Sequence, residues 1–562
     1  MNKKYTPTRA QESSNAIERL YITMRHLFNR GFYKPTGVSG ESIRQALLLL
    51  RPEIYGSIAE EKVEIEGLSY VLDRLPEGIE QCRFINLTSS EGFAKSHFKV
   101  IIPPKRRRNC YRVDDEQMNI EITRGRSDVY DVLTHLTFLY NESLKIKNRV
   151  LLNVTTGKTK REWEKFEKAI AKNKTLTVSE REIALTHAAT FLARSFEEAQ
   201  AVYDSFKTKK NPDRFLQIIY WLGTLAIEEA VENSKRAITF SPVLREQIGH
   251  HIHGEIWANN IKKVLDKKGL LNRPIHIISA NMHSTMNSIY APIVFEKELK
   301  KGKDIMSLFA DLSKSENKII RKKIIDFSNK NGLTYIEDTS GTNINVQLID
   351  TAKIDFSKTN YKLDVSKEEK PVLFVMDYAF GEQAYETLDE FLKPFTKNNT
   401  KTHLNVVSIS IMGKAGILTG NKGDIMIPDA HMFEGTADNY VFENQLKKED
   451  LEGYGIGVVA GTMLTVLGTS LQNKDMLEYF QKSSWRVMGL EMEGAHYQKA
   501  IQAASKIRKN IRKDVKVSYA YYASDNPLKT GATLASGGLG ETGVKPTYLI
   551  TRKIIEQIFN TK

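Results

Sequence analysis

The chain is poor in cysteine and has no long apolar run. Only Cys82 and Cys110 occur among 562 residues, too few for a disulfide framework, so we expect a protein of the reducing cytoplasm. No apolar stretch reaches the roughly 18–20 residues that a membrane-spanning helix needs. The first residues contain lysine but no apolar segment typical of a signal peptide. We therefore expect no membrane association.

Basic residues are in excess, with a formal net charge of +14. Nucleic-acid binding is one interpretation, but RNA-recognition signatures, zinc-finger spacings and basic zippers are missing. Much of the excess is lysine interleaved with acidic residues, as in 299–323, and Lys105–Arg108 is a dense basic run. That run suits an anionic effector, a nucleic acid or a solvated turn. A solvated lysine-rich surface is the favoured interpretation of the charge, followed by an anionic small-molecule substrate.

The length predicts several domains, because 562 residues exceed what one hydrophobic core supports. Residues 371–562 alternate apolar strands with helices, which predicts a wound mixed α/β sheet with helices on both faces. A large α+β and helical region precedes it. The expected division is an α+β domain 1–150, a helical segment 151–253, a small α/β unit 254–352, a charged linker 353–370 and the domain 371–562.

Two acidic signatures follow apolar strands near the C-terminal end. Gly489–Ala495 reads GLEMEGA after an apolar segment, and Ser524–Leu528 reads SDNPL after VSYAYYA. Open α/β sheets bind their ligands at the carboxyl ends of strands, so these carboxylates are candidate site residues. A third segment, Gly413-Lys414-Ala415-Gly416, is expected to form a glycine-rich turn after the strand 404–412. Such a turn lets backbone N–H groups approach an oxyanion, although ordinary tight turns look the same.

These motifs together resemble the nucleoside phosphorylase superfamily over residues 371–562. Gly413–Gly416 with Gly423–Pro428 is similar to its glycine-rich turn and the following strand, Glu491–Ala495 to its Met-Glu ribose motif, and Ser524-Asp525 to its catalytic Ser-Asp. Within the superfamily the AMP nucleosidase branch is the nearest, through the extended Ser524–Leu528 and a long preceding region. The chain departs from that branch by an insertion, Lys529–Leu539, and by the lack of a motif match before residue 371.

The resemblance implies roles for individual residues. Asp525 would protonate N7 of the leaving purine, Glu493 would accept the ribose 2′- and 3′-hydroxyls, and Glu382 would activate water. Glu382 also suits a helix start for dipole reasons. The remaining candidate substrate-binding residues are Met492, Gly413, Ala415, Gly416 and Ser524, with Lys414 and Lys529 as candidates for a 5′-phosphate. No metal or other cofactor is implied.

The resemblance predicts hydrolysis of a purine N-ribosidic bond, with AMP as the preferred substrate and a homo-oligomeric enzyme of purine salvage. Phosphorolysis is the first alternative. A non-catalytic protein that senses nucleotides or associates with RNA is the second.

Three further segments carry possible sites. The imidazoles and carboxylate of His250–Glu255 suggest a metal site, against which Gly254 and the irregular spacing argue. Ser279–Ser284 follows a strand and suits a second ligand site. Thr155–Thr159 imitates the end of a phosphate-binding loop but lacks the upstream glycine, and we exclude it.

Overall fold

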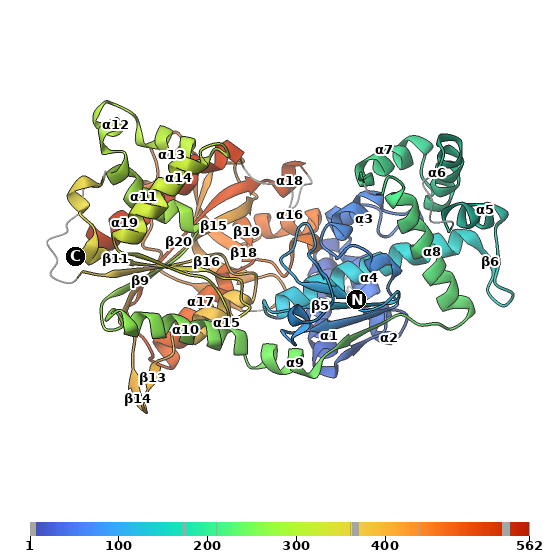
Figure 1. The fold of residues 1–562 in the computed structure, drawn as a ribbon, viewed down its shortest axis with the longest axis horizontal. Coiled ribbons are helices and arrows are strands. Elements are labelled where there is room, and N and C mark those ends of the chain that lie inside the picture. Colours follow the sequence, from blue (N-terminus) through green and yellow to red (C-terminus); the bar gives the residue numbers. More distant parts are fainter. Residues whose placement is uncertain are drawn as a thin grey trace, which may run out of the picture. The chain divides into compact units, whose positions relative to one another are not determined.

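The structure, a computed structural model, describes residues 7–171, 176–209, 211–359, 361, 370–436, 438–530 and 540–560. Residues 531–539 of the expected insertion and most of the expected linker lie outside these ranges. The chain forms two compact units. The first contains the residues up to Thr123, Asp128–Gly249 and Ser470–Asn473, and the second contains Arg124–Ser127, His250–Thr469 and the residues from Lys474 onward (Figure 1).

The first unit is built on a six-stranded mixed sheet with the order β1-β8-β2-β5-β4-β3. Its strands are β1 (Phe32–Tyr33), β2 (Phe84–Thr88), β3 (Val100–Ile101), β4 (Cys110–Arg112), β5 (Gln117–Glu121) and β8 (Ala237–Phe240). Its helices are α1 (Arg9–Arg30), α2 (Val38–Leu50), α3 (Ile65–Leu72), α4 (Arg126–Val150), α5 (Arg161–Ile170), α6 (Val178–Leu192), α7 (Phe196–Phe206), α8 (Arg214–Val231) and α9 (Pro242–Gly249). A hairpin joins β6 (Leu151–Asn153) to β7 (Lys158–Thr159).

Local signals explain the ends of these helices. A reciprocal capping box between Thr8 and Gln11 starts α1, and Gly31 ends it with φ of 80°. Similar boxes start α6 at Thr177 and α7 at Ser195. Strand β8, from the segment expected to be helical, pairs with β1 and β2. Residues 1–150 and 151–253 therefore contribute to one sheet.

Two of the four residues in the basic run Lys105–Arg108 form internal ion pairs, whereas Lys105 and Arg107 are exposed. Arg108 is only 3% exposed, and its guanidinium pairs with Asp128 at 2.8 Å and with Asp131. Arg106 binds Asp131 through both carboxylate oxygens, at 2.8 and 2.9 Å. The carboxylate partners lie about 20 residues further along the chain. They draw half of the expected surface charge into an internal ion-pair network. This network speaks against the run as a nucleic-acid site.

The second unit is a ten-stranded mixed sheet covered by helices on both faces, which confirms the expected wound α/β architecture. Nine strands follow the order β10-β11-β12-β9-β15-β19-β18-β16-β17, and β20 pairs with β15 and β16. The strands are β9 (Ile275–Ser279), β10 (Leu333–Ile336), β11 (Val346–Asp350), β12 (Val372–Met376), β15 (Val406–Ile417), β16 (Ile425–Phe433), β17 (Asn439–Val441), β18 (Val458–Thr465), β19 (Val487–Glu491) and β20 (Lys516–Asp525). A separate hairpin contains β13 (Phe395–Lys397) and β14 (Thr400–Thr402).

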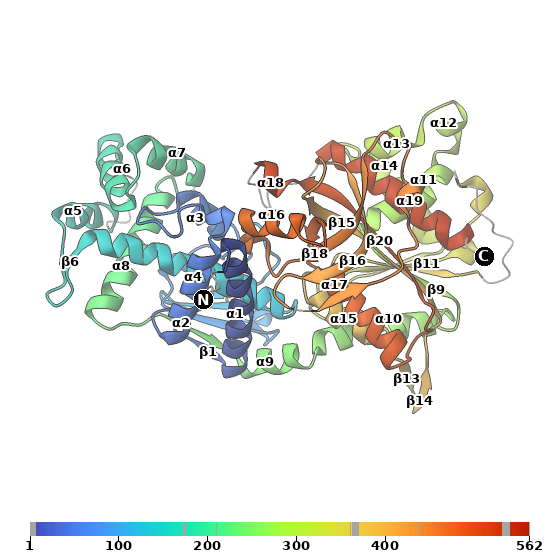
Figure 2. The same ribbon diagram turned by 180° about the vertical axis from the view of Figure 1, so that it is seen from behind.

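Helices α10 (Ile252–Lys267), α15 (Gln383–Phe391) and α17 (Gly494–Gln502) cover one face of this sheet. Helices α11 (Met282–Val294), α13 (Ile305–Ser313), α14 (Lys318–Lys330) and α19 (Val544–Asn560) cover the other (Figure 2). The remaining helices are α12 (Glu296–Lys300), α16 (Lys474–Lys482) and α18 (Pro527–Thr530). None of the helices in the described ranges is both long enough and apolar enough to cross a bilayer.

Strands from before and after the expected linker belong to one sheet. Strand β12 pairs with β11 on one side and with β9 on the other, and β9 also pairs with β15. The segments 254–352 and 371–562, expected as separate domains, are thus interleaved in a single sheet. Sequence pattern identifies strands but does not reveal which of them pair.

Candidate active site

Strand β15 brings the two acidic signatures together. Its residue Gly416 is paired with Leu490 of β19 on one side and with Asp525 of β20 on the other. Each signature therefore lies at the end of a strand, and both strand ends reach the same short stretch of β15. The prediction that apolar strands end at these carboxylates is confirmed, and the register explains how two motifs far apart in sequence meet.

The glycine-rich segment is not a turn, contrary to the prediction. Gly413, Lys414, Ala415 and Gly416 belong to β15, which continues to Ile417 with a β-bulge between Ala415 and Gly416. Its pairing with β20 along this stretch keeps the backbone extended. A bulge redirects neighbouring side chains, and Lys414 here is exposed. In place of the expected oxyanion-binding turn there is a bulged strand that bears the charged side chain of Lys414.

Asp525 is a buried carboxyl group whose two oxygens differ in their partners. Its side chain is 8% exposed, and the Ser524 hydroxyl donates to Oδ1 at 2.6 Å. Oδ2 is buried and has no hydrogen-bond partner among the described residues. Burial raises the pKa of Asp525, while the Ser524 hydrogen bond and the charges of Lys414 and Lys422 lower it. Ser524 thus fixes one carboxyl oxygen as an acceptor and leaves the other for a ligand.

Glu491 and Glu493 form a second acidic group at the end of β19. Glu491 is 2% exposed and accepts hydrogen bonds from the Thr465 hydroxyl and the N–H groups of Glu493 and Gly494. Burial raises its pKa to about 7. Burial also raises the pKa of Glu493 to about 8, helped by the charge of Glu491 and opposed by Lys414. Lys414 is therefore within electrostatic reach of both Glu493 and Asp525.

The loop after β12 holds Glu493 in place. The Gly381 N–H donates to Glu493 Oε1 at 2.8 Å. Met492 lies against the same glycine, since a Cβ built there would be 3.9 Å from its methyl group. The next residue, Glu382, forms an ion pair with Arg126 at 3.1 Å. The structure therefore places Glu382 beside the loop that contacts Glu493.

Residues Arg124–Ser127 belong to this site, and sequence reasoning missed them. Arg124 lies over the Phe380 ring at 4.8 Å, and the Ser127 hydroxyl accepts the Glu382 N–H at 2.9 Å. These contacts join residues about 255 positions apart. No local sequence pattern predicts these contacts, because the segment lies in the region for which we found no motif match to the superfamily.

Lys529 is engaged with a neighbouring loop. Its ammonium donates to the Gly420 carbonyl at 3.1 Å and to Asn421 Oδ1 at 2.9 Å. Asn526 also donates to the Gly420 carbonyl, at 3.1 Å. The motif Ser524–Leu528 thus leads into α18, whose lysine fastens the loop before β16. Lys414, the other lysine proposed for a 5′-phosphate, acts electrostatically on both acidic groups.

The other candidate segments have structural partners. His253 Nδ1 lies 2.7 Å from the Ser340 carbonyl, and no group of three or more potential metal ligands occurs among the described residues. Ser279 bonds the Tyr497 hydroxyl at 3.0 Å, and Asn281 caps α11. These contacts join the end of β9 to α17 and start the next helix.

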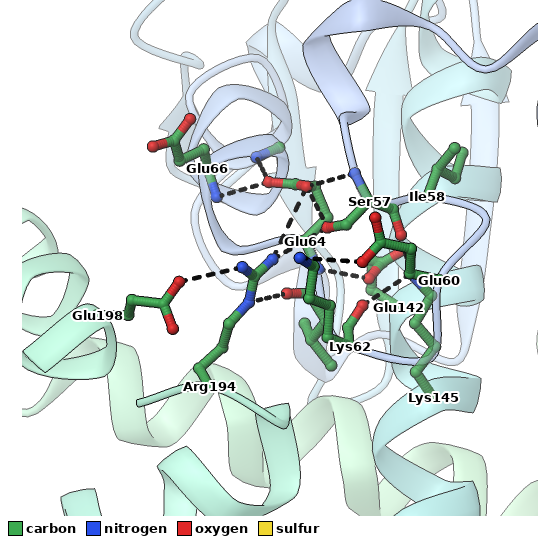
Figure 3. Close-up of polar contacts among 12 residues, drawn as sticks. Ser57, Ile58, Glu60, Lys62, Glu64, Glu66, Glu142, Lys145, Arg194 and Glu198 are labelled. Atoms are coloured by element: carbon green, nitrogen blue, oxygen red, sulfur yellow. Dashed lines mark hydrogen bonds and ion pairs between the residues drawn. The ribbon is translucent and has the colours of Figure 1, made fainter. Parts of the chain in front are cut away.

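The first unit contains its own polar cluster, shown in Figure 3. Glu64 accepts the Ser57 N–H at 2.8 Å and lies 3.8 Å from Arg194, while its own N–H donates to Glu142 at 2.8 Å. Lys145 pairs with Glu142 at 2.9 Å. The cluster borders a hollow of about 400 Å³. Because its members bond mainly to one another, it fastens the segment 57–64 to α4 and to the residues before α7.

Comparison with known proteins gives a family but no activity. A family model described as a family of unknown function (DUF6909) matches residues 41–301 and 308–560. No curated protein matches the chain. Among solved structures, a putative methylthioadenosine nucleosidase from Weissella paramesenteroides matches with a TM-score of 0.30 and 12% identity, over 51% of this chain and 99% of that one.

Two other solved structures give similar values. The 5′-methylthioadenosine/S-adenosyl homocysteine nucleosidase of Campylobacter jejuni matches with a TM-score of 0.31, and the futalosine hydrolase of Helicobacter pylori with 0.29. Both are 12% identical, over 51% of this chain and 99% of theirs. Scores this low do not establish common chemistry, so the function has to be inferred from the site itself.

Proposed function

This chain belongs to the DUF6909 family of unknown function, and we propose that it hydrolyses the N-ribosidic bond of a purine nucleotide or nucleoside. The observation that carries the proposal is the pairing of Gly416 with both Leu490 and Asp525. That register brings the ends of β19 and β20, which carry the carboxyl groups that we assign to ribose binding and to proton donation, to the two sides of one strand. A glycosidic bond lying across this strand would meet an acid at its base and an acceptor at its sugar.

Asp525 is the general acid of the proposed reaction. Burial raises its pKa, and the Ser524 hydrogen bond to Oδ1 leaves Oδ2 as the oxygen that can face the base. Donation from Oδ2 to N7 of the purine makes the base a better leaving group as positive charge develops on the sugar. General acid catalysis of this kind contributes roughly 10²–10⁴-fold to a rate.

Glu493 is the ribose-binding residue. One of its oxygens is held by the Gly381 N–H, and the group lies within reach of the Lys414 charge. In its carboxylate form, which prevails above its pKa of about 8, its remaining acceptor positions suit a pair of neighbouring hydroxyls. Glu491, held by two backbone N–H groups and Thr465, fixes the backbone from which Glu493 projects.

A nucleotide such as AMP is the proposed substrate, and water the proposed nucleophile. Lys414 and Lys422 are both exposed and both act on the pKa of Asp525, so their charges favour an anionic substituent close to the site. Glu382, oriented by Arg126, is the proposed base for water. Phosphate as the nucleophile remains the alternative reaction, and its products differ.

The test is chromatographic detection of adenine after incubation with AMP, with and without inorganic phosphate. We expect adenine and ribose 5-phosphate at a rate that phosphate does not raise. Asp525→Asn should lower kcat by at least roughly a hundredfold, because the amide cannot deliver the proton. Asp438→Asn, at an exposed aspartate of the same unit, is the matched control and should keep the parent rate.

The outcomes separate the hypotheses. Ribose 1,5-bisphosphate as product would replace hydrolysis by phosphorolysis. An unchanged rate in Asp525→Asn would refute the assigned acid. No base release from AMP, adenosine, inosine or methylthioadenosine, together with thermal stabilisation by AMP, would identify a binding protein instead.

A further inference from the structure

A cavity lies at the opposite ends of the strands that carry the candidate active site. It encloses about 570 Å³ and lies where β9, β15 and β20 begin, near Pro274, Asn405 and Lys516. Asp525 marks the far end of β20. The cavity volume falls in the range typical of small-molecule sites. Because the two places lie at opposite ends of the same strands, this cavity is separate from the proposed catalytic groups.

The floor of the cavity is polar in a part of the sheet where apolar residues are expected. His276 of β9 and Ser408 of β15 are paired residues, and Ser410 of β15 is paired with Ser518 of β20. Alternation along a strand places Ser408 and Ser410 on one face. All four side chains line the cavity, with exposed fractions of 6%, 8%, 2% and 5% in the order named.

The polar character is confined to the cavity. Further along the same face the strands carry Ile278, Met412 and Ala520, which belong to the apolar core. Central strands covered on both faces normally read as continuous apolar runs. Burying a hydroxyl or an imidazole is unfavourable unless it is hydrogen-bonded. A cluster of polar side chains from three neighbouring strands, beside an open volume, therefore indicates a surface built to contact a polar ligand.

Hydrogen bonds hold this floor in position. His276 Nδ1 lies 2.7 Å from Ser408 Oγ. The Ser518 hydroxyl donates to Gln557 Oε1 at 3.3 Å, and Gln557 Nε2 donates to the Gln445 carbonyl at 2.8 Å. Gln557 comes from α19, so sheet and helix fix the lining together. Preorganised groups lose little entropy when a ligand binds.

The rim carries an excess of positive charge. Its charged residues are Lys370, Arg512, Lys516 and Lys553 against Asp450 and Glu556. Lys553 pairs with Glu556 at 3.1 Å, and Arg512 pairs with Asp514 at 2.6 Å. Lys516 is paired in register with Ser408 and so stands beside the polar floor. The cavity thus combines a floor of groups that can bind hydroxyls with a positively charged rim.

We propose that this cavity binds a small hydroxylated organic anion of the sugar-phosphate class. The hydroxyls of such a ligand suit Ser410, Ser518 and His276, and its anionic group suits the edge at Lys516. The site is distinct from the proposed nucleosidase site and does not depend on it.

The test is isothermal titration calorimetry with ribose 5-phosphate as the probe. The protein carries Glu493→Ala, which removes the ribose acceptor of the proposed active site, so that remaining binding comes from elsewhere. We expect saturable binding that Lys516→Met weakens at least roughly tenfold, since a charge-assisted hydrogen bond is lost. Lys513→Met removes the same charge at an exposed neighbour outside the cavity and should leave the affinity unchanged.

Ribose and inorganic phosphate serve as partial probes, and both should bind more weakly than ribose 5-phosphate. Absence of saturable binding would overturn the proposal, as would equal weakening by Lys516→Met and Lys513→Met. Binding of either partial probe as tight as that of ribose 5-phosphate would also overturn the ligand class. If Glu493→Ala fails to fold, the titration is repeated with the parent protein, and only the binding that Lys516→Met weakens and Lys513→Met does not is assigned to the cavity.

Discussion

Replacing Gly381 by alanine should lower the stability of the fold and displace the backbone N–H that holds Glu493. Gly381 has a φ of +57°, where an L-residue costs about 1–2 kcal/mol. A Cβ at this position would also lie 2.7 Å from Ser127 Cβ and closer still to its hydroxyl. Overpacking of this kind costs typically about 1–3 kcal/mol. The sum predicts a loss of about 2–5 kcal/mol in the free energy of unfolding.

The matched control is Gly453→Ala. Gly453 also has a left-handed φ, of +84°, but a Cβ there would meet nothing within 4 Å. It should therefore lose only the conformational part, about 1–2 kcal/mol. Because the Gly381 N–H binds Glu493, only Gly381→Ala should also raise KM for the nucleotide. Urea unfolding and initial-rate kinetics measure the two effects.

A double variant tests the cause. Ser127→Gly removes the atoms that the new methyl group would strike, so adding it to Gly381→Ala should restore part of the lost stability despite the missing hydroxyl acceptor. Equal destabilisation by Gly381→Ala and Gly453→Ala, with no change in KM, would refute the assigned contact. So would a double variant less stable than the sum of the two single changes predicts.

Two further predictions concern buried charge. Glu491 has a pKa of about 7 against an ordinary 4.5, so the folded state keeps a proton that the unfolded state releases, and stability falls as pH rises from about 4.5 to about 8. Glu491→Gln should remove its own share of this fall, the rest coming from Glu493 with its pKa of about 8. The variant should be about 3 kcal/mol more stable than the parent at pH 8 but not at pH 4.5. Thermal melts across this range check it, with exposed Glu452→Gln as the control. Arg108→Met should destabilise the first unit by about 3–5 kcal/mol, because it leaves buried carboxylates without their cation. Arg107→Met, at an exposed neighbour, should match the parent in urea unfolding. Equal unfolding midpoints for the two variants would contradict the buried ion pair.

The sequence predicted those parts of the site that depend on local pattern. Apolar strands that end at Glu491 and Asp525 were recognisable because a strand and its terminal carboxylate are neighbours in the chain. The wound α/β class followed from the alternation of strands and helices. The glycines at 413–416 misled, since glycine marks turns, bulges and close approaches alike, and only pairing with β20 shows that the strand continues.

Long-range contacts were beyond such reasoning. The Arg126–Glu382 ion pair and the burial of Arg108 against Asp128 both join segments whose proximity no periodicity encodes. The sheet order had the same difficulty, because an apolar strand such as β9 fits several neighbours equally well. Ser408 and Ser518 looked unremarkable for a similar reason, and only the register places them on one cavity floor.

The late position of β20 has a consequence for synthesis of the protein. Strand β15 is complete at Ile417, but its long parallel partner β20 is not made until residue 525. Until then one edge of β15 has unpaired backbone groups, a state prone to association with other chains. A chain truncated before this strand would lack Asp525 and would leave one edge of β15 unpaired. The site can therefore form only after Asp525 has been synthesised. Chaperones that bind exposed strands should act on the chain between the synthesis of β15 and that of β20.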